Sequence, residues 1–115
     1  MKFSLIVCTY MRAKPLADLL DSVQLQTRYP DEILIVDGSR NTETQNMLAA
    51  KPYCNLQYFL VDDAHRGLTR QRNFGIGKTA ADTQIICFLD DDTILESTYF
   101  EQILKTYALF PEALG

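Results

Sequence analysis

The sequence has few cysteines, little positive charge and no long hydrophobic run. Its three cysteines, Cys8, Cys54 and Cys87, are odd in number and far apart, and no C-x-x-C pair occurs. This spacing favours neither a disulfide framework nor a zinc site. We therefore expect reduced thiols buried in the core, as in a protein of the reducing cytosol.

The deficit of positive charge limits what the protein can bind. Lysine and arginine together number 11 against 15 aspartates and glutamates, which gives a net charge of -4 at pH 7. A nucleic acid needs clustered lysine and arginine to neutralise its phosphates, so we expect no nucleic-acid partner. An anionic ligand of this acidic chain would need a local cation.

The hydrophobic runs are too short for a membrane span or a secretory signal. The longest run near the start is Leu5 to Cys8, whereas a spanning helix needs about 20 apolar residues. We expect no transmembrane segment and a mature chain that begins at Met1.

What the sequence does contain is the pattern of a single α/β domain over residues 1–115. The chain is 47% hydrophobic and 23% charged, which suffices for one core without disulfide or metal staples. Short runs rich in β-branched residues alternate with stretches of helical spacing, so we predict a Rossmann-like open, mostly parallel sheet flanked by helices. The first and last predicted strands are nearly continuous apolar and should be buried on both faces. The predicted strands are Phe3–Thr9, Glu32–Asp37, Leu56–Val61 and Gln84–Leu89.

Four helices are predicted between and after these strands. Capping boxes mark the second helix at Thr42-x-x-Gln45 and the last at Thr98-x-x-Glu101. The third is expected over residues 68–79. The first opens at Pro15 and presents one apolar face made of Leu16, Leu19, Leu20 and Val23.

The third predicted helix has an unusual face. Leu68, Arg72 and Ile76 fall at i, i+4 and i+8, so a guanidinium shares a stripe with two apolar side chains. Arg72 is therefore expected to reach a carboxylate or a phosphate. The glycine-rich motif at 75–79 lacks the leading glycine and strand of a phosphate-binding P-loop, so we expect Gly77 to end the helix.

Polar residues gather where the predicted strands end. Because ligands bind outside the carboxyl ends of parallel strands, these residues should converge at one edge of the sheet. In strand order they are Thr9, Tyr10 and Arg12; Asp37, Gly38 and Ser39; Asp62, Asp63, His65 and Arg66; and Asp90, Asp91 and Asp92.

The acidic triplet at Asp90, Asp91 and Asp92 is the strongest of these signals. Neighbouring carboxylates repel one another unless a cation offsets their charge. Mg²⁺ and Mn²⁺ take oxygen ligands and are commonly held by one or two carboxylates together with substrate phosphates. The alternative is that the acids are solvated or cap the next helix, but Thr98 and Glu101 already supply a cap, so we favour a metal site.

Three further features have both a functional and a structural interpretation. Asp37-Gly38-Ser39 either receives the polar edge of a base or ribose or forms a tight turn, and the sequence favours neither. His65 is more typical of a solvated loop histidine than of a catalytic one. Tyr10 is typical of packing, except that it lies at the expected ligand edge.

Four segments occur in a characteristic order: residues 4–12 (SLIVCTYMR), 26–39 (QTRYPDEILIVDGS), 66–76 (RGLTRQRNFGI) and 88–92 (FLDDD). Together they resemble the N-terminal nucleotide-binding half of family 2 glycosyltransferases, which have the GT-A fold. The segments are spread over nearly the whole chain, which makes the match specific.

The resemblance implies a metal-dependent, inverting glycosyltransferase with a nucleotide-diphospho-sugar donor. Asp90 and Asp92 would form the D-x-D pair that holds Mn²⁺ or Mg²⁺ on the diphosphate, with Arg72 near the same acids or phosphates. Thr9, Tyr10 and Asp37 would approach the base and ribose. The donor-binding residues expected from the resemblance are Thr9, Tyr10, Arg12, Asp37, Arg66, Arg72, Asp90 and Asp91.

Two departures from the family pattern bear on function. Gly38 stands where members often carry a second acid in contact with the base, which leaves the identity of the base open. Members also have a second half with the acceptor groove and an Asp or Glu general base, whereas this chain ends first. We therefore assign no catalytic residue, and expect a domain truncated before the acceptor half that binds donor and metal but transfers poorly or not at all.

The resemblance also implies a glycan or lipid-linked acceptor and a cytoplasmic protein, or one peripheral at the inner face of the membrane. Three alternatives stay open. One is a non-catalytic sugar-nucleotide-binding module. A second is a receiver-like Mg²⁺-binding domain, which would need acids where Thr9 and Tyr10 follow the first strand. The third is a haloacid-dehalogenase-type phosphatase, for whose further motifs the short remainder after Asp92 leaves no room.

Overall fold

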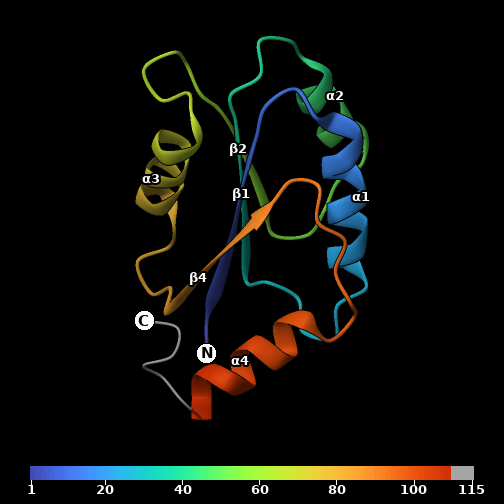
Figure 1. Cartoon of the computed structure of the whole chain (residues 1–115), viewed down its shortest axis with the longest axis vertical. Helices are drawn as coiled ribbons and strands as arrows, with labels where there is room; N and C mark the ends of the chain where they lie inside the picture. The colour runs from blue at the N-terminus through green and yellow to red at the C-terminus, as the bar shows by residue number, and fades with distance from the viewer. Residues whose placement is uncertain (110–115) are drawn as a thin grey trace.

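The computed structural model describes residues 1–109, which form a parallel sheet with helices on both faces (Figure 1). The strand order across the sheet is β3-β2-β1-β4, and each neighbouring pair is parallel. The predicted α/β class is confirmed, and residues 110–115 of the predicted domain lie outside the described part. The elements are β1 (Phe3–Thr9), α1 (Ala13–Gln24), β2 (Glu32–Asp37), α2 (Glu43–Ala50), β3 (Leu56–Leu60), α3 (Leu68–Lys78), β4 (Ile85–Asp90) and α4 (Tyr99–Leu109).

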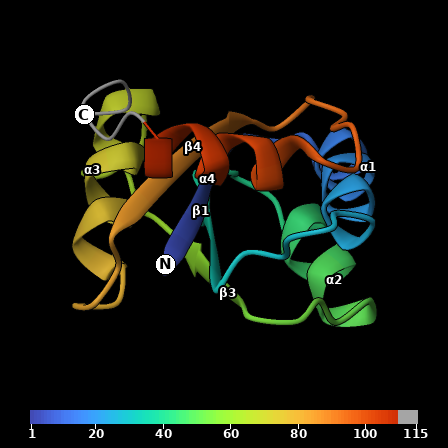
Figure 2. The same ribbon diagram turned by 90° about the horizontal axis from the view of Figure 1, so that it is seen from below.

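Alternation along the strands sends side chains into two cores. On one face of the sheet, Phe3 and Leu5 pack with residues of α1, α2 and α4. On the other face, Ile6 and Val36 pack with Phe74 of α3. Seen from below, α3 accordingly lies on one side of the sheet and α1 and α2 lie on the other (Figure 2).

The fourth strand is less buried than predicted. β1 is buried along nearly its whole length, as expected, but β4 lies at the edge of the sheet and is half exposed, with Phe88 38% exposed. The prediction was wrong because an apolar run indicates a strand but does not specify its neighbours. The first two strands have the predicted bounds, whereas β3 ends one residue early and β4 is shifted by one residue.

The helices form close to where they were predicted, but their first turns differ. α1 begins at Ala13, so Pro15 lies within its first turn, and the predicted apolar face is buried. The capping box at Thr42 does not form, since the Thr42 side chain makes no capping hydrogen bond. The Asn41 side chain instead accepts a hydrogen bond from the backbone N–H of Glu43 (3.2 Å). Within residues 1–109, no helix is long and apolar enough to cross a membrane.

α3 faces the sheet differently from the prediction. Leu68 and Ile76 are 56% and 44% exposed, and the buried residues of the helix are Gln71 and Gly75. A Cβ atom at Gly75 would lie 2.9 Å from the Cγ2 methyl of Ile6, so the absence of a side chain lets the helix backbone approach the sheet. Gly77, expected to end the helix, lies inside it, and α3 ends at Lys78.

The two helical glycines give opposite predictions for stability. We expect Gly75→Ala to lower the free energy of unfolding by about 1–3 kcal/mol, because the added methyl meets a branched side chain that cannot turn away. Gly77→Ala is the matched control: nothing lies within 4 Å of its Cβ position, and alanine should raise stability by about 0.5–1 kcal/mol. Urea unfolding of both variants measures the difference, and equal stabilities would contradict the close helix–sheet contact.

Candidate functional site

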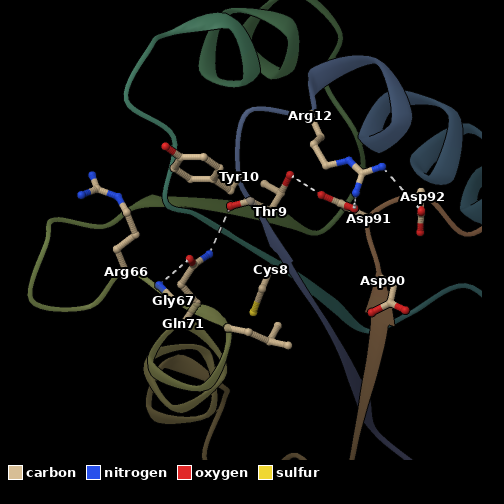
Figure 3. A pocket seen from close by; sticks show the side chains of 11 residues that line it. Cys8, Thr9, Tyr10, Arg12, Arg66, Gly67, Gln71, Asp90, Asp91 and Asp92 are labelled. Carbon is tan, nitrogen blue, oxygen red and sulfur yellow. Dashed lines mark hydrogen bonds and ion pairs between the residues drawn. The ribbon is translucent and has the colours of Figure 1, made fainter.

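A cavity of about 560 Å³ opens at the carboxyl ends of β1 and β4 (Figure 3). Parallel pairing brings the two ends together, since Cys8 of β1 lies opposite Asp90 of β4. Of the four polar clusters predicted at the strand ends, the first, third and fourth contribute to the cavity and the second does not. The lining residues are Cys8, Thr9, Tyr10, Arg12, Arg66, Gly67, Leu68, Gln71, Asp90, Asp91 and Asp92.

Asp91 is the buried member of the acidic triplet. It is 7% exposed, and its Oδ2 accepts a hydrogen bond from the Thr9 hydroxyl (2.8 Å). Its Oδ1 lies 3.7 Å from a guanidinium nitrogen of Arg12. A buried carboxylate is tolerated where a donor and a cation face it. Asp91 therefore ties the end of β4 to the start of the β1–α1 loop.

Asp90 and Asp92, on either side of this buried carboxylate, are exposed. Asp92 lies 3.6 Å from the second guanidinium nitrogen of Arg12. In the part of the chain that the structure describes, no three His, Cys, Asp or Glu side chains gather into a group that could hold a metal. Asp90 and Asp92 alone are fewer carboxylates than such a group needs, so a divalent ion held here would also need oxygen ligands from another source, such as a phosphate.

Arg66 is the second cation of the cavity. Its Nε donates a hydrogen bond to the carbonyl oxygen of Gly38 (2.6 Å), and its guanidinium also pairs with Asp63. Arg12 and Arg66 are the two cations of the cavity lining, and each of them faces a neighbouring acid. Tyr10, 43% exposed, is also part of the cavity wall.

Asp37, predicted to bind donor, does not line the cavity. It is fully buried: its Oδ1 accepts a hydrogen bond from the Ser39 backbone N–H (2.9 Å) and its Oδ2 accepts one from the Tyr58 hydroxyl (2.6 Å). Burial, and then the hydrogen bond to Asp37, raises the pKa of Tyr58. This is the tight-turn interpretation of Asp37-Gly38-Ser39.

Arg72, the other predicted donor-binding residue outside the cavity wall, does not reach the acids in the described part of the chain. Its guanidinium carbon lies 5.4 Å from the centre of the Phe88 ring on β4, which is a cation–π contact. Sequence reasoning could not foresee this partner, because the exposed aromatic face belongs to an edge strand that was expected to be buried.

The residue that sequence reasoning missed is Gln71. It is 4% exposed, and its amide nitrogen donates to the carbonyl oxygens of Thr9 (3.2 Å) and Val36 (2.9 Å). Its amide oxygen accepts a hydrogen bond from the backbone N–H of Gly67 (3.1 Å), a residue with φ +117° that favours glycine. Its partners Thr9 and Val36 lie in distant segments, so no local signal in the sequence indicated this role.

The three thiols are less uniform than the sequence suggested. Cys54 is exposed, which corrects the expectation that all three are buried, and Cys8 and Cys87 are partly buried. Burial raises the pKa of both partly buried thiols from 9.0 to about 11. Cys8, on the cavity wall, is therefore a protonated and weakly nucleophilic thiol at neutral pH.

Comparison with known proteins gives one consistent family. The model described as "Glycosyl transferase family 2" matches residues 4–111. The O-antigen chain rhamnosyltransferase RfbN of Salmonella typhimurium is 33% identical over 95 residues, which cover 83% of this chain and 29% of that protein. The UDP-Gal:alpha-D-GlcNAc-diphosphoundecaprenol beta-1,3-galactosyltransferase of Escherichia coli is 30% identical over 107 residues, or 90% of this chain and 38% of that protein.

Solved structures agree with the sequence comparisons. The crystal structure of S. aureus TarS 1-349 in complex with UDP-GlcNAc matches with a TM-score of 0.78 and 25% identity, over 95% of this chain and 32% of that one. The chain thus spans about a third of the length of these relatives.

The bond between Thr9 and Asp91 predicts a stability difference between two threonines. Thr9→Val keeps the shape of the side chain but removes the hydroxyl that faces the buried carboxylate, so we expect a loss of about 1–3 kcal/mol in the free energy of unfolding. Thr69→Val, on the exposed face of α3, should change it by less than about 0.5 kcal/mol. Urea titrations compare the two, and matching midpoints would mean that the hydroxyl does not stabilise Asp91.

The raised thiol pKa values predict selective alkylation. At pH 8, iodoacetamide should modify the exposed Cys54 first and leave Cys8 and Cys87 largely unmodified, because a pKa of about 11 leaves little thiolate. Raising the pH towards 10 should accelerate their modification. Peptide mass spectrometry follows each site, with urea-unfolded protein as the control in which all three react; rapid labelling of Cys8 in the folded protein at pH 8 would be inconsistent with its burial.

Proposed function

This chain belongs to glycosyl transferase family 2, and we propose that its cavity binds a nucleotide-diphospho-sugar donor. The observation that carries the proposal is the charge of the cavity lining. Two arginines face three aspartates there, which gives a net charge of -1. A diphosphate is repelled by such a wall on its own, whereas one divalent cation added to it reverses the sign of the local charge.

The relatives support a donor of this class. TarS has been crystallised with UDP-GlcNAc and with UDP, and the E. coli relative is named for a UDP-Gal donor. The cavity volume of about 560 Å³ is within the usual range for small-molecule sites. The family match leaves the receiver-like and phosphatase alternatives without support.

The residues divide between the two ends of the donor. Tyr10 is exposed on the wall and is available to stack on a base, with Thr9 beside it. Arg12 and Arg66 supply charge for the diphosphate. Asp37 supports this wall through its turn, because the Ser39 hydroxyl accepts a hydrogen bond from the backbone N–H of Met11 (2.7 Å). Direct contact of Asp37 or Arg72 with the donor remains a prediction from the resemblance.

We propose that Asp90 and Asp92 hold the divalent ion, Mn²⁺ or Mg²⁺. Both are exposed at the end of β4 (Figure 3), and carboxylates combined with phosphate oxygens are the ligands that these hard cations prefer. When bound, such an ion stabilises negative charge on a departing diphosphate. Asp91 has a structural role in the cavity wall, since it is buried and accepts a hydrogen bond from Thr9.

For the whole protein we propose transfer of the sugar with inversion to a glycan or lipid-linked acceptor. The printed name of the E. coli relative, which specifies a diphosphoundecaprenol-linked acceptor, supports the lipid-linked class. The proposed location is the cytoplasm or the inner face of the membrane. Among the residues of this chain we assign donor and metal binding, and no general base.

Calorimetry with uridine, guanosine and thymidine diphosphosugars, with and without Mn²⁺, tests the proposal. We expect binding that requires the metal, and a loss of about tenfold or more in affinity for Asp90→Asn and Asp92→Asn, because each removes a charged ligand. Asp82→Asn removes the same charge at the amino end of β4, where Asp82 pairs with Lys2, and should bind like the unsubstituted chain.

The outcomes separate the two parts of the proposal. Binding that needs no metal and survives both substitutions would refute the metal assignment alone. If none of the diphosphosugars binds in the presence of Mn²⁺, the donor site itself is wrong. Binding without turnover in the intact protein would favour a non-catalytic module.

A further inference from the structure

A single buried side chain joins three of the segments that surround the cavity. The amide nitrogen of Gln71 bonds to the carbonyl oxygen of Thr9, 62 residues away, and to that of Val36, 35 residues away. Its amide oxygen accepts the N–H of Gly67 at the start of α3. The amide nitrogen thereby links the ends of β1 and β2 to α3, and the amide oxygen binds the N-terminus of the helix. Figure 3 draws the bonds to Thr9 and Gly67.

The space that this amide occupies is available because residue 38 has no side chain. A Cβ atom at Gly38 would lie 2.7 Å from Oε1 and 3.3 Å from Cδ of Gln71, and 3.2 Å from Cγ of Arg66. The Gly38 carbonyl oxygen also accepts the hydrogen bond from Arg66 Nε (2.6 Å). A side chain at position 38 would therefore overlap with the Gln71 amide group and crowd the side chain of Arg66 in the cavity wall.

We infer that Gln71 is a positioning residue for the donor cavity. Its side chain can occupy this place only because residue 38 is glycine. This inference rests on the proposed donor site. Gln71 holds the β1–α1 loop, which carries Tyr10, against the start of α3, which follows Arg66. The distance between these two sides of the cavity is thereby fixed for donor binding.

The chemistry of the amide makes the inference specific. Gln71 donates through its nitrogen and accepts through its oxygen, and a carboxylate of the same size can only accept. Gln71→Glu would therefore place a negative charge against two carbonyl oxygens. Gln71→Ala removes all three side-chain hydrogen bonds but leaves a helix-favouring residue.

A double-mutant cycle tests the pairing of Gln71 with Gly38. Thermal unfolding should show that Gly38→Ala and Gln71→Ala each lower the midpoint by several degrees, because each breaks a buried polar network. In the Gln71→Ala background, Gly38→Ala should change the midpoint little, since two of the three close atoms are gone. Strictly additive shifts would overturn the inference.

Donor affinity tests the positioning role itself. With Mn²⁺ present and below every unfolding midpoint, Gln71→Ala, Gln71→Glu and Gly38→Ala should each weaken binding of the best diphosphosugar by about tenfold, which corresponds to one well-placed contact. Glu32→Ala is the matched control: Glu32 is 8% exposed, and accepts hydrogen bonds from Ser4 Oγ and the Ala80 backbone N–H at the opposite end of the sheet. Glu32→Ala should destabilise the fold but leave donor affinity within about twofold of the unsubstituted chain, because a loss of stability far from the cavity should not by itself weaken donor binding.

The results distinguish this inference from the function on which it rests. Unchanged affinity in the Gln71 and Gly38 variants, with tight binding by the unsubstituted chain, would overturn the positioning role alone. An equal loss in Glu32→Ala would do the same, because it would reduce the effect to general destabilisation. Failure of the unsubstituted chain to bind any diphosphosugar would overturn both. Should Gln71→Glu fail to fold, the alanine variants still decide the question.

Discussion

Three carboxylates in succession at a strand end repel one another, and the cavity is built around the way this repulsion is offset. Asp91, in the turn that follows β4, is buried, and there Thr9 donates a hydrogen bond to it and the guanidinium of Arg12 lies 3.7 Å away. The same guanidinium lies 3.6 Å from Asp92. One arginine thus faces two acids, and the exposed carboxylates of Asp90 and Asp92 remain at the mouth of the site. The adjacency of β1 and β4 makes this arrangement possible, because it brings residues more than 80 positions apart into contact.

Much of the fold could be predicted because short-range patterns determine it. The apolar runs at Phe3–Thr9 and Glu32–Asp37 are strands with the predicted bounds, and the spacing of leucines in α1 indicates its buried face correctly. The failures lie where a second segment decides the outcome. The face that α3 presents to the sheet follows from the close approach of Gly75 to Ile6, not from its leucine and isoleucine, and the burial of β4 depends on its place at the edge.

The location of the candidate site could be predicted from the sequence, but the hydrogen bonds and contacts among its residues could not. Strand ends and acids indicate the edge of the sheet, and Tyr10, Arg12 and the acidic triplet do line the cavity. The amide of Gln71 escaped prediction because its partners lie in distant segments, and no local pattern distinguishes a bonded buried glutamine from an exposed one. Arg72 lies at the predicted helical position, but its contact in this structure is the aromatic ring of Phe88 on the edge strand.

The charge of the cavity connects its architecture to its proposed chemistry. An anion approaching this wall meets two arginines whose charges are already opposed by neighbouring acids: Arg12 by Asp91 and Asp92, and Arg66 by Asp63. Neither guanidinium is therefore a free counter-charge for a diphosphate. At the proposed metal site, a divalent cation held by Asp90 and Asp92 would offset the charge of Asp92 beside Arg12, which would leave more of the arginine's field for the phosphates. Metal and arginine would on this argument act as one unit, and the inward bond of Asp91 is what keeps Arg12 close enough to take part.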